Sequence, residues 1–160
     1  MRERMHLLRR PRQAARAPRG FSMIEVLVSL VIFSLGLLAL VSLQATALRM
    51  ATDARDRTTA AFLADQLMAR LLIADPTSAS AYAHHATGST ACAPTGTASS
   101  NATVTGWLTE VARQLPNATA DMQQVVVDAA TSRVTVQLCW QNGSDAPRSL
   151  SVTNVVQWQS

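Results

Sequence analysis

The hydrophobic positions are continuous near the start of the chain and become periodic further along it. From Val26 to Leu43, eighteen residues carry no charge, and the apolar run is interrupted only by Ser29, Ser34, Gly36 and Ser42. A helix needs about 20 predominantly apolar residues to span the hydrocarbon core of a bilayer. The segment is therefore predicted to be a membrane-spanning helix.

The helix is predicted to continue well beyond this segment, because no proline occurs between Pro18 and Pro76. A helix from Phe21 to about Ala74 would be roughly 80 Å long at about 1.5 Å per residue. Its second half is amphipathic, with apolar residues in steps of three and four: Leu43, Ala47, Met50, Ala54, Ala61, Ala64, Met68 and Leu71. The opposite side carries the polar residues Arg49, Asp53, Asp56, Asp65 and Arg70. We expect lipid or sister helices to cover the first half and a small domain to cover the stripe.

Residues 77–106 are dominated by Ser, Thr, Ala and Gly and are predicted to form a long surface loop. His84 and His85 are adjacent in it, without a third ligand at the spacing of a metal site. We expect both to be solvated loop residues and predict no metal site.

The remainder of the chain predicts a short helix and three strands. Apolar spacing indicates a helix from Trp107 to Leu115, ended by Pro116 and Asn117. Strand patterns follow at 124–128, 133–141 and 150–158, with the apolar face Val134, Val136, Leu138, Trp140, Leu150, Val152, Val156 and Trp158. Short turns favour an antiparallel meander that lays this face, both tryptophans included, on the striped half of the helix. The predicted fold class is α+β, a lollipop with a long N-terminal helix packed on a small antiparallel sheet.

The net charge of +4 is unevenly distributed. Residues 1–20 hold seven arginines and one glutamate, a net +6, whereas residues 21–160 hold seven arginines and nine acids, a net −2. A basic arm directly before an apolar segment is typical of a cytoplasmic flank. The acidic body argues against a nucleic-acid-binding surface, so no nucleic acid is expected as a partner.

One alternative for the apolar segment is an ordinary secretory signal. Ala45, Thr46 and Ala47 form an A-x-A cleavage pattern just after the apolar run. The run is longer than the usual 7–15 apolar residues of such signals, and no turn signal follows it. These two features favour a retained helix over a cleaved signal.

The stretch RG-FSMIEVLVSL, from Arg19 to Leu30, resembles the type IV prepilin signature. The resemblance implies a prepilin peptidase that cuts after Gly20 and N-methylates Phe21. Glu25 would then pair with the N-terminal amine of a neighbouring subunit in the filament. A carboxylate at the end of a membrane helix is costly enough to expect a partner or a function in any case, although Glu25 could also snorkel to the interface.

The resemblance to minor pilins of the PilV type extends more loosely through the long helix to Leu115 and Pro116. It implies a basic leader (1–20), a transmembrane and filament-core helix (21–43), an amphipathic helix half (44–75) and a periplasmic head (76–160). Many major pilins carry a proline in the first half of this helix, and this chain has none. Whether the helix melts locally in a filament is therefore left open.

Cys92 and Cys139 both follow the apolar segment, so export would place them where a disulfide can form. Cys139 lies on the strand face opposite Trp140, where the loop bearing Cys92 can reach it. Two unpaired buried thiols are the alternative.

No phosphate-binding loop, HExxH motif or grouping of nucleophile, base and acid is evident, so we expect neither an enzyme nor a cofactor. The expected function is a structural subunit that primes pilus assembly and sits at or near the tip, in adhesion or motility. A minor pseudopilin of a type II secretion system would have a nearly identical N-terminus. A DNA-uptake pilin would need a basic head.

The resemblance also implies partners and a location. The partners are the prepilin peptidase, the major pilin and other minor pilins, and the inner-membrane assembly platform, with a tip adhesin as a further candidate. The chain would sit in the inner membrane with a periplasmic head before assembly, and in a surface pilus afterwards.

Overall fold

The computed structural model describes residues 20–88 and 91–156. The chain divides into two compact units, 1–46 and 47–160. Helix α1 (Met23–Leu72) is continuous and contributes to both units. The long helix and a three-stranded antiparallel sheet confirm the predicted α+β class.

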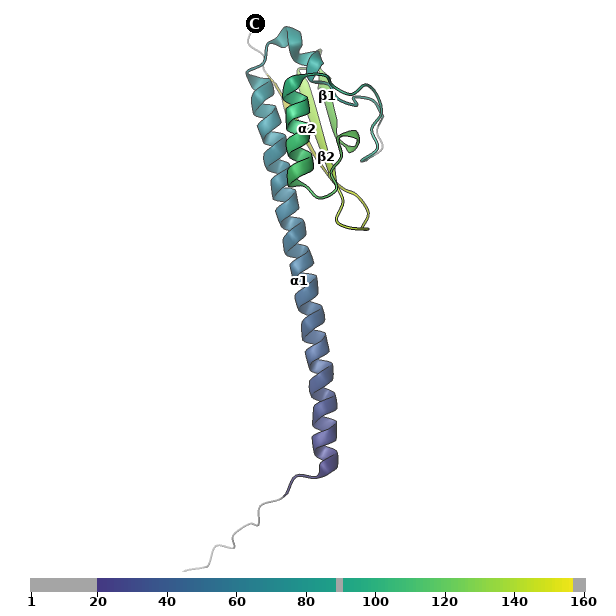
Figure 1. Ribbon diagram of the computed structural model, residues 1–160. Helices are drawn as coiled ribbons and strands as arrows, with labels where there is room; N and C mark the ends of the chain where they lie inside the picture. Colours follow the sequence, from purple (N-terminus) through teal and green to yellow (C-terminus); the bar gives the residue numbers. More distant parts are fainter. Residues whose placement is uncertain (1–19, 89–90, 157–160) are drawn as a thin grey trace, which may run out of the picture. The chain divides into compact units, whose positions relative to one another are not determined.

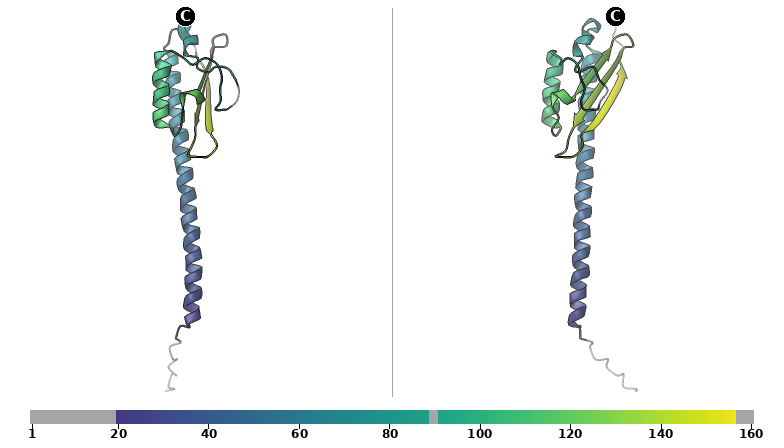
Figure 2. Two further views of the ribbon diagram at one scale, coloured as in Figure 1. Left: turned by 45° about the vertical axis from the view of Figure 1, so that its right-hand side comes forward. Right: turned by 90° about the vertical axis from the view of Figure 1, so that its right-hand side faces the viewer.

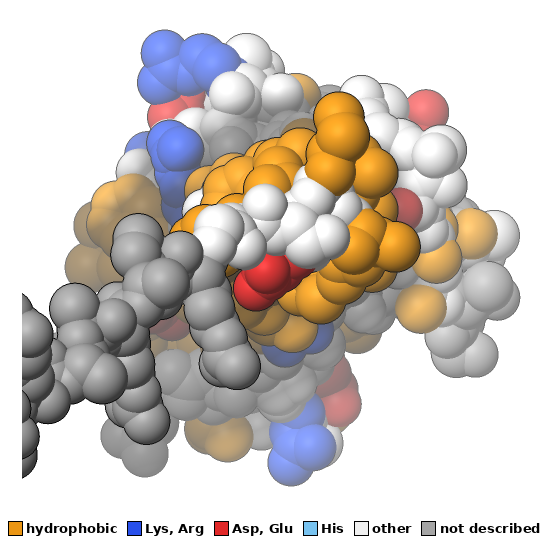
Figure 3. Space-filling model, turned by 90° about the horizontal axis from the view of Figure 1, so that it is seen from below, with side chains coloured by type: hydrophobic (Ala, Val, Ile, Leu, Met, Phe, Trp, Pro, Cys, Tyr) orange, Lys and Arg blue, Asp and Glu red, His pale blue; other side chains and the backbone are white. Residues whose placement is uncertain are grey.

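In the first unit, the large apolar side chains of α1 are exposed, and the view from its N-terminal end shows them around the part of the helix that the grey residues do not hide (Figure 3). The helix begins two residues later than predicted and ends two residues earlier. It contains no proline and no break, and hydroxyls at Ser29, Ser34 and Thr46 donate to the carbonyl four residues earlier. The predicted leader, 1–20, lies outside the described residues apart from Gly20.

The second unit consists of the C-terminal part of α1, a second helix, two short 3₁₀ helices and the sheet (Figures 1 and 2). Along the chain these are η1 (Pro76–Tyr82), α2 (Ala102–Gln114), η2 (Ala120–Met122), β1 (Gln124–Asp128), β2 (Arg133–Trp140) and β3 (Arg148–Val155). The strands form an antiparallel meander in the order β1-β2-β3. Asp128 closes the first hairpin by accepting bonds from Ala130 N, Thr131 N and the Thr131 hydroxyl.

One hydrophobic core joins α1, α2 and the inner face of the sheet. Val134, Val136, Leu138 and Trp140 are completely buried, as the alternation of β2 predicted. Trp107 of α2 is also buried, and its indole N–H donates to Leu63 O on α1 at 2.8 Å. The two helices are therefore joined by both apolar packing and a buried hydrogen bond.

The buried face of α1 differs from the predicted stripe. Its buried side chains are Asp56, Ala60, Leu63, Ala64, Leu67, Met68 and Leu71. Leu43, Ala47, Met50 and Ala54 were predicted to pack on the domain and are exposed instead. The C-terminal part of the stripe is confirmed, since Ala64, Met68 and Leu71 are buried. The N-terminal part was wrong because the buried residues of α1 begin only at Asp56. From there the buried face is wider than one stripe, because α1 packs in one core with both α2 and the sheet.

Asp53 and Asp56 were predicted on the solvent side of α1, and this was also wrong. Asp56 is only 8% exposed and accepts a bond from Asn142 Nδ2 at 2.9 Å. Arg148, the first residue of β3, pairs with Asp53. The two carboxylates attach the β2–β3 connection to α1, an interaction between distant segments that helical periodicity does not reveal.

The predicted loop over 77–106 contains more structure than expected. Residues 76–82 form η1, and α2 begins at Ala102, five residues before the predicted start. Asn101 caps α2 by accepting a bond from Thr103 N at 2.9 Å. The third strand begins two residues earlier than predicted and ends three residues earlier, at Val155, and Trp158 lies outside the described residues.

Replacing Leu67 with alanine should destabilise the second unit by about 2–5 kcal/mol, because it leaves a cavity between α1 and its covering elements. Phe62→Ala is the matched control on the same helix, since Phe62 is 62% exposed and should contribute little. Chemical unfolding of the full-length chain in detergent micelles, followed by tryptophan fluorescence, measures both. Equal losses in the two variants would contradict the assigned core face.

Candidate functional site: the start of α1 and the disulfide-linked loop

The residues preceding α1 form a short non-helical segment. Gly20, Phe21 and Ser22 have no regular structure, and both Gly20 and Phe21 are exposed. The Ser22 carbonyl accepts bonds from Glu25 N and Val26 N and so begins the helical pattern. The peptide bond after Gly20 therefore lies in an accessible backbone segment, outside the helical hydrogen bonds that would protect it from a peptidase.

Glu25 is the acidic residue in the first turn of α1, where the helix dipole favours a negative charge. Its side chain is exposed and makes no hydrogen bond or ion pair with a described residue. Its backbone carbonyl accepts the Ser29 hydroxyl at 2.6 Å. The described part of the chain therefore leaves the carboxylate accessible to a cation from another molecule.

Among the described helices, α1 is long and apolar enough to cross a membrane by length and composition. None of its most apolar eighteen-residue window is buried within the chain. The next charged residue after Glu25 is Arg49, which leaves a segment about 35 Å long without a charge. This length matches the thickness of a hydrocarbon core.

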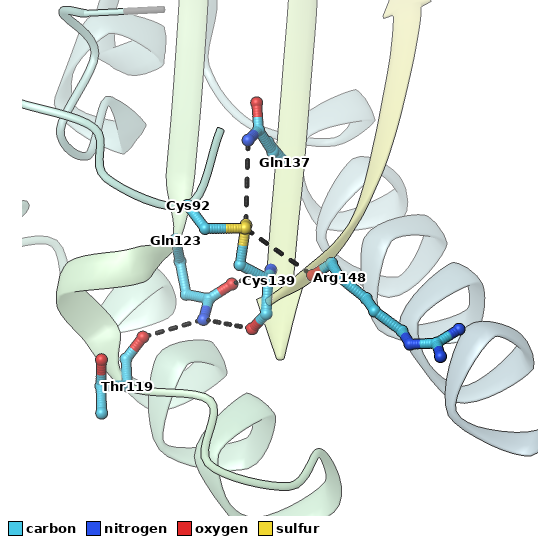
Figure 4. Close-up of a disulfide and its surroundings, with 6 residues drawn as sticks. All are labelled: Cys92, Thr119, Gln123, Gln137, Cys139 and Arg148. Carbon is cyan, nitrogen blue, oxygen red and sulfur yellow. Dashed lines mark hydrogen bonds between the residues drawn. A yellow bond between two sulfur atoms is a disulfide. The ribbon is translucent and has the colours of Figure 1, made fainter. Parts of the chain in front are cut away.

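In the second unit, Cys92 and Cys139 are joined by a disulfide with a Cα–Cα distance of 5.5 Å (Figure 4). The predicted pairing is confirmed. Cys139 lies on β2 and is completely buried, while Cys92 comes from the long loop between η1 and α2. The bond therefore attaches that loop to the sheet face opposite the core.

Gln123 holds Cys139 in place in a way that the sequence analysis missed. The Cys139 N–H donates to Gln123 Oε1 at 2.8 Å, and Gln123 Nε2 donates to Cys139 O at 3.0 Å (Figure 4). The same Gln123 Nε2 also donates its other hydrogen to Thr119 O at 2.8 Å. The buried side-chain amide of Gln123 thus bonds to both backbone groups of Cys139. It takes the place that a backbone peptide group would have if β1 began earlier in the chain. A glutamine just before a strand was the only sequence signal.

His84 is 2% exposed, so the prediction of a solvated residue was wrong. Its Nδ1 accepts the Ser99 N–H at 3.0 Å, which places the ring proton on Nε2, and Nε2 donates to Ala120 O at 3.0 Å. Burial lowers the pKa of His84 below its ordinary 6.5, although the bond to Ala120 opposes this shift. His84 therefore acts as a neutral bridge between the loop and η2.

Two further contacts fix the loop. Thr87 and Thr95 exchange backbone hydrogen bonds of 2.9 and 2.8 Å. Gly96 has a φ of 110°, and a Cβ there would lie 2.7 Å from Thr87 Oγ1, so only glycine fits. Gln124 Nε2 donates to the carbonyl of His85 at 2.9 Å.

Among the described residues, no three His, Cys, Asp or Glu side chains gather in a group that could hold a metal ion.

Comparison with known proteins finds a match to the start of α1. Residues 15–41 match the family model described as the prokaryotic N-terminal methylation motif. No curated protein and no solved structure matches the chain. The motif and the apolar helix together support a membrane-anchored, type IV prepilin-like protein. The match includes Gly20, Phe21 and Glu25 but ends well before the disulfide-linked loop.

Replacing Cys92 and Cys139 together with serine should lower the free energy of unfolding of the second unit by up to about 4 kcal/mol. The bond joins residues 47 apart, and a cross-link of that span restricts the unfolded chain by this amount in the chain-entropy account. Unfolding of the full-length variant and of the reduced parent chain should show the same loss. An unchanged midpoint in both would contradict a stabilising role.

Acidification should weaken the loop through His84. A lowered pKa in the folded state means that this contribution is present above pH 6.5 and is lost as the pH falls below it. We expect the Ser99 amide to lose hydrogen-exchange protection between pH 7 and pH 5. His84→Gln should reduce this pH dependence, and His85→Gln should retain it, because the His85 ring does not bond to Ser99. Equal behaviour of the two variants would contradict the bridge.

Proposed function

We propose that this chain is a minor type IV pilin, a structural subunit that helps to prime pilus assembly. The match of residues 15–41 to the N-terminal methylation motif carries the proposal. Its support in the structure is an exposed, non-helical Gly20–Phe21 bond placed directly before an uncovered apolar helix. The looser resemblance to PilV-type minor pilins supports the minor role.

The first step is hydrolysis of the bond after Gly20 on the cytoplasmic face, where the basic leader remains. Removal of the leader leaves Phe21 as a new N-terminal amine next to the apolar segment. Without that cut, seven arginines would have to leave the cytoplasm before the chain could enter a filament, at a high cost in a bilayer. Processing is therefore the event that permits assembly.

Glu25 then provides the negative partner for the terminal amine of a neighbouring subunit. It lies four positions from Phe21 and has no described partner within its own chain. An unpaired charge among packed helices is strongly penalised, so pairing two such charges selects one axial register over others. The pair thus contributes to the specificity of assembly.

The second unit supports a structural role. Residues 21–160 carry a net charge of −2, which does not favour binding of a polyanion such as DNA. The disulfide is suited to the oxidising environment outside the cytoplasm. A periplasmic head before assembly and a position at or near the pilus tip afterwards agree with both features.

Gly20→Arg should block processing and leave a full-length precursor in the inner membrane, because the peptidase no longer meets glycine at the cut. Immunoblotting of membrane fractions and of sheared pili should show the uncleaved form in the membrane only. Ser22→Ala, two residues away, should be processed normally. Uncleaved chain in sheared pili at the parental level would contradict the proposal.

Glu25→Ala should insert into the membrane at least as well as the parent chain, because the change removes the charge directly before the apolar segment. It should nevertheless fail to enter filaments if the carboxylate pairs with a neighbouring amine. Membrane fractionation and a count of surface pili measure both effects. Ser29→Ala is the matched control one turn along, where only a local hydroxyl bond is lost. Wild-type piliation with Glu25→Ala present in sheared pili would show that the pair is dispensable.

A further inference from the structure

The two edges of the sheet differ in how they end. Along β1, Val125 exchanges backbone hydrogen bonds with His84, at 2.9 and 3.0 Å, so the loop covers that edge. At the other edge, β3 pairs with β2 on one side, and no described residue forms a strand pairing on its other side. β3 is the outermost strand in the right-hand view of Figure 2, in agreement with the strand order.

The pairing register identifies the backbone groups that β3 directs outward. Val156 N donates to Ser132 O, one step beyond the Arg133–Val155 pair, which marks Ser132 and Val156 as a hydrogen-bonded pair. Hydrogen-bonded and non-hydrogen-bonded pairs alternate in an antiparallel ladder, so every second residue of β3 counted back from Val156 bonds to β2. The intervening residues of β3, Ser149, Ser151 and Thr153, then point their N–H and C=O groups away from β2. The same alternation places Val125 outward on β1, where it does bond to His84.

The outer edge of β3 lacks the features that usually prevent strand addition. Edge strands are commonly protected by charge, proline, a bulge or short length. β3 has eight residues paired without interruption, and residues 149–155 contain no charge and no proline. Its one charged residue, Arg148, is paired with Asp53. Among the described residues, the side chain of Asn154 occupies the Val155 N–H at 2.8 Å, and no hydrogen bond is made to the outward N–H groups of Ser149, Ser151 and Thr153.

The side chains along this edge indicate what would pair there. Leu150 and Val152 pack partly on the core and remain half-buried, whereas Ser149, Ser151 and Thr153 on the other face are exposed. An added strand would extend both faces of the sheet, the half-buried apolar face and the exposed polar face. Its residues beside Leu150 and Val152 would be apolar, and the alternate residues would be small and polar. A charged partner strand would meet no opposite charge between 149 and 155.

We propose that the outer edge of β3 takes up an extended strand from a different membrane-anchored subunit of the same assembly. This inference rests on the proposed function and adds the mode of contact. Three backbone positions, Ser149, Ser151 and Thr153, provide the main-chain hydrogen bonds. Leu150 and Val152 provide the apolar contact that selects the partner strand.

A second copy of the chain does not suit this edge. Two identical strands pair most simply across a two-fold axis, which makes them antiparallel. Because β3 lies alongside α1 within its unit (Figure 2), that axis would also reverse the direction of the second α1. Two subunits inserted in one membrane with the same topology have their helices in the same direction. The occupant is therefore a different subunit.

A photo-crosslinking residue at Thr153, in the full-length chain expressed in its own strain, tests the contact. We expect one major adduct, identified by mass spectrometry as a different subunit with an apolar N-terminal helix. Ser151→Pro in the same chain removes one outward N–H but no bond to β2, so it should reduce the adduct about tenfold. Ser151→Ala retains the N–H and should leave the adduct unchanged.

Controls separate loss of contact from loss of fold. Ser151→Pro should keep the parental melting temperature within a few degrees, whereas Leu150→Pro removes an N–H that bonds to β2 and should lower it clearly. Crosslinking from Thr109, exposed on α2, should not give the same adduct. An adduct with a second copy, or none from Thr153 while the chain enters filaments normally, would overturn this inference and leave the proposed function intact. Absence of the parent chain from filaments would overturn both.

Discussion

The apolar surface of α1 that nothing in its own chain covers is the constraint on which the rest of the molecule depends. Eighteen consecutive residues without a charge are exposed in the structure. Burial of apolar surface is worth about 25 cal/mol per Å², so a helix of this kind is not stable alone in water. Lipid must cover it first, and other apolar helices can replace lipid later. Under the proposed function, the Glu25 carboxylate directly before this segment responds to the change of environment, because an unpaired charge among packed helices is strongly penalised and the terminal amine of a neighbouring subunit would relieve that penalty.

The second unit has a different problem, which is its small size. Its core contains one broad face of α1, one face of α2 and the inner face of the three strands. The disulfide from Cys92 to Cys139 attaches the loop to the outer face of the sheet, and Gln123 completes the backbone bonding of Cys139. His84 fixes one end of the same loop. These contacts allow a segment rich in Ser, Thr and Gly to hold a fixed conformation without a core of its own.

Sequence reasoning was most accurate where a single physical rule decides the structure. The absence of proline between Pro18 and Pro76 predicted α1 to within two residues at each end, a short valine-rich run predicted β1, and alternation predicted the buried face of β2. It failed where distant segments meet. Asp56 and His84 appeared exposed by periodicity or composition, yet Asn142 and Ser99 supply partners that make their burial favourable. The start of α2 was missed because its first residues are small and its cap, Asn101, resembles the loop before it.

The same distinction applies to the site. Gly20, Phe21 and Glu25 form a local signature, so sequence was sufficient to find them, and the methylation-motif match covers all three. The most direct test is the mass of the N-terminal peptide of the chain extracted from its native membrane. The account predicts N-methylated Phe21 as the first residue. A chain that begins at Leu48, after the Ala45–Ala47 pattern, or an intact leader would contradict it.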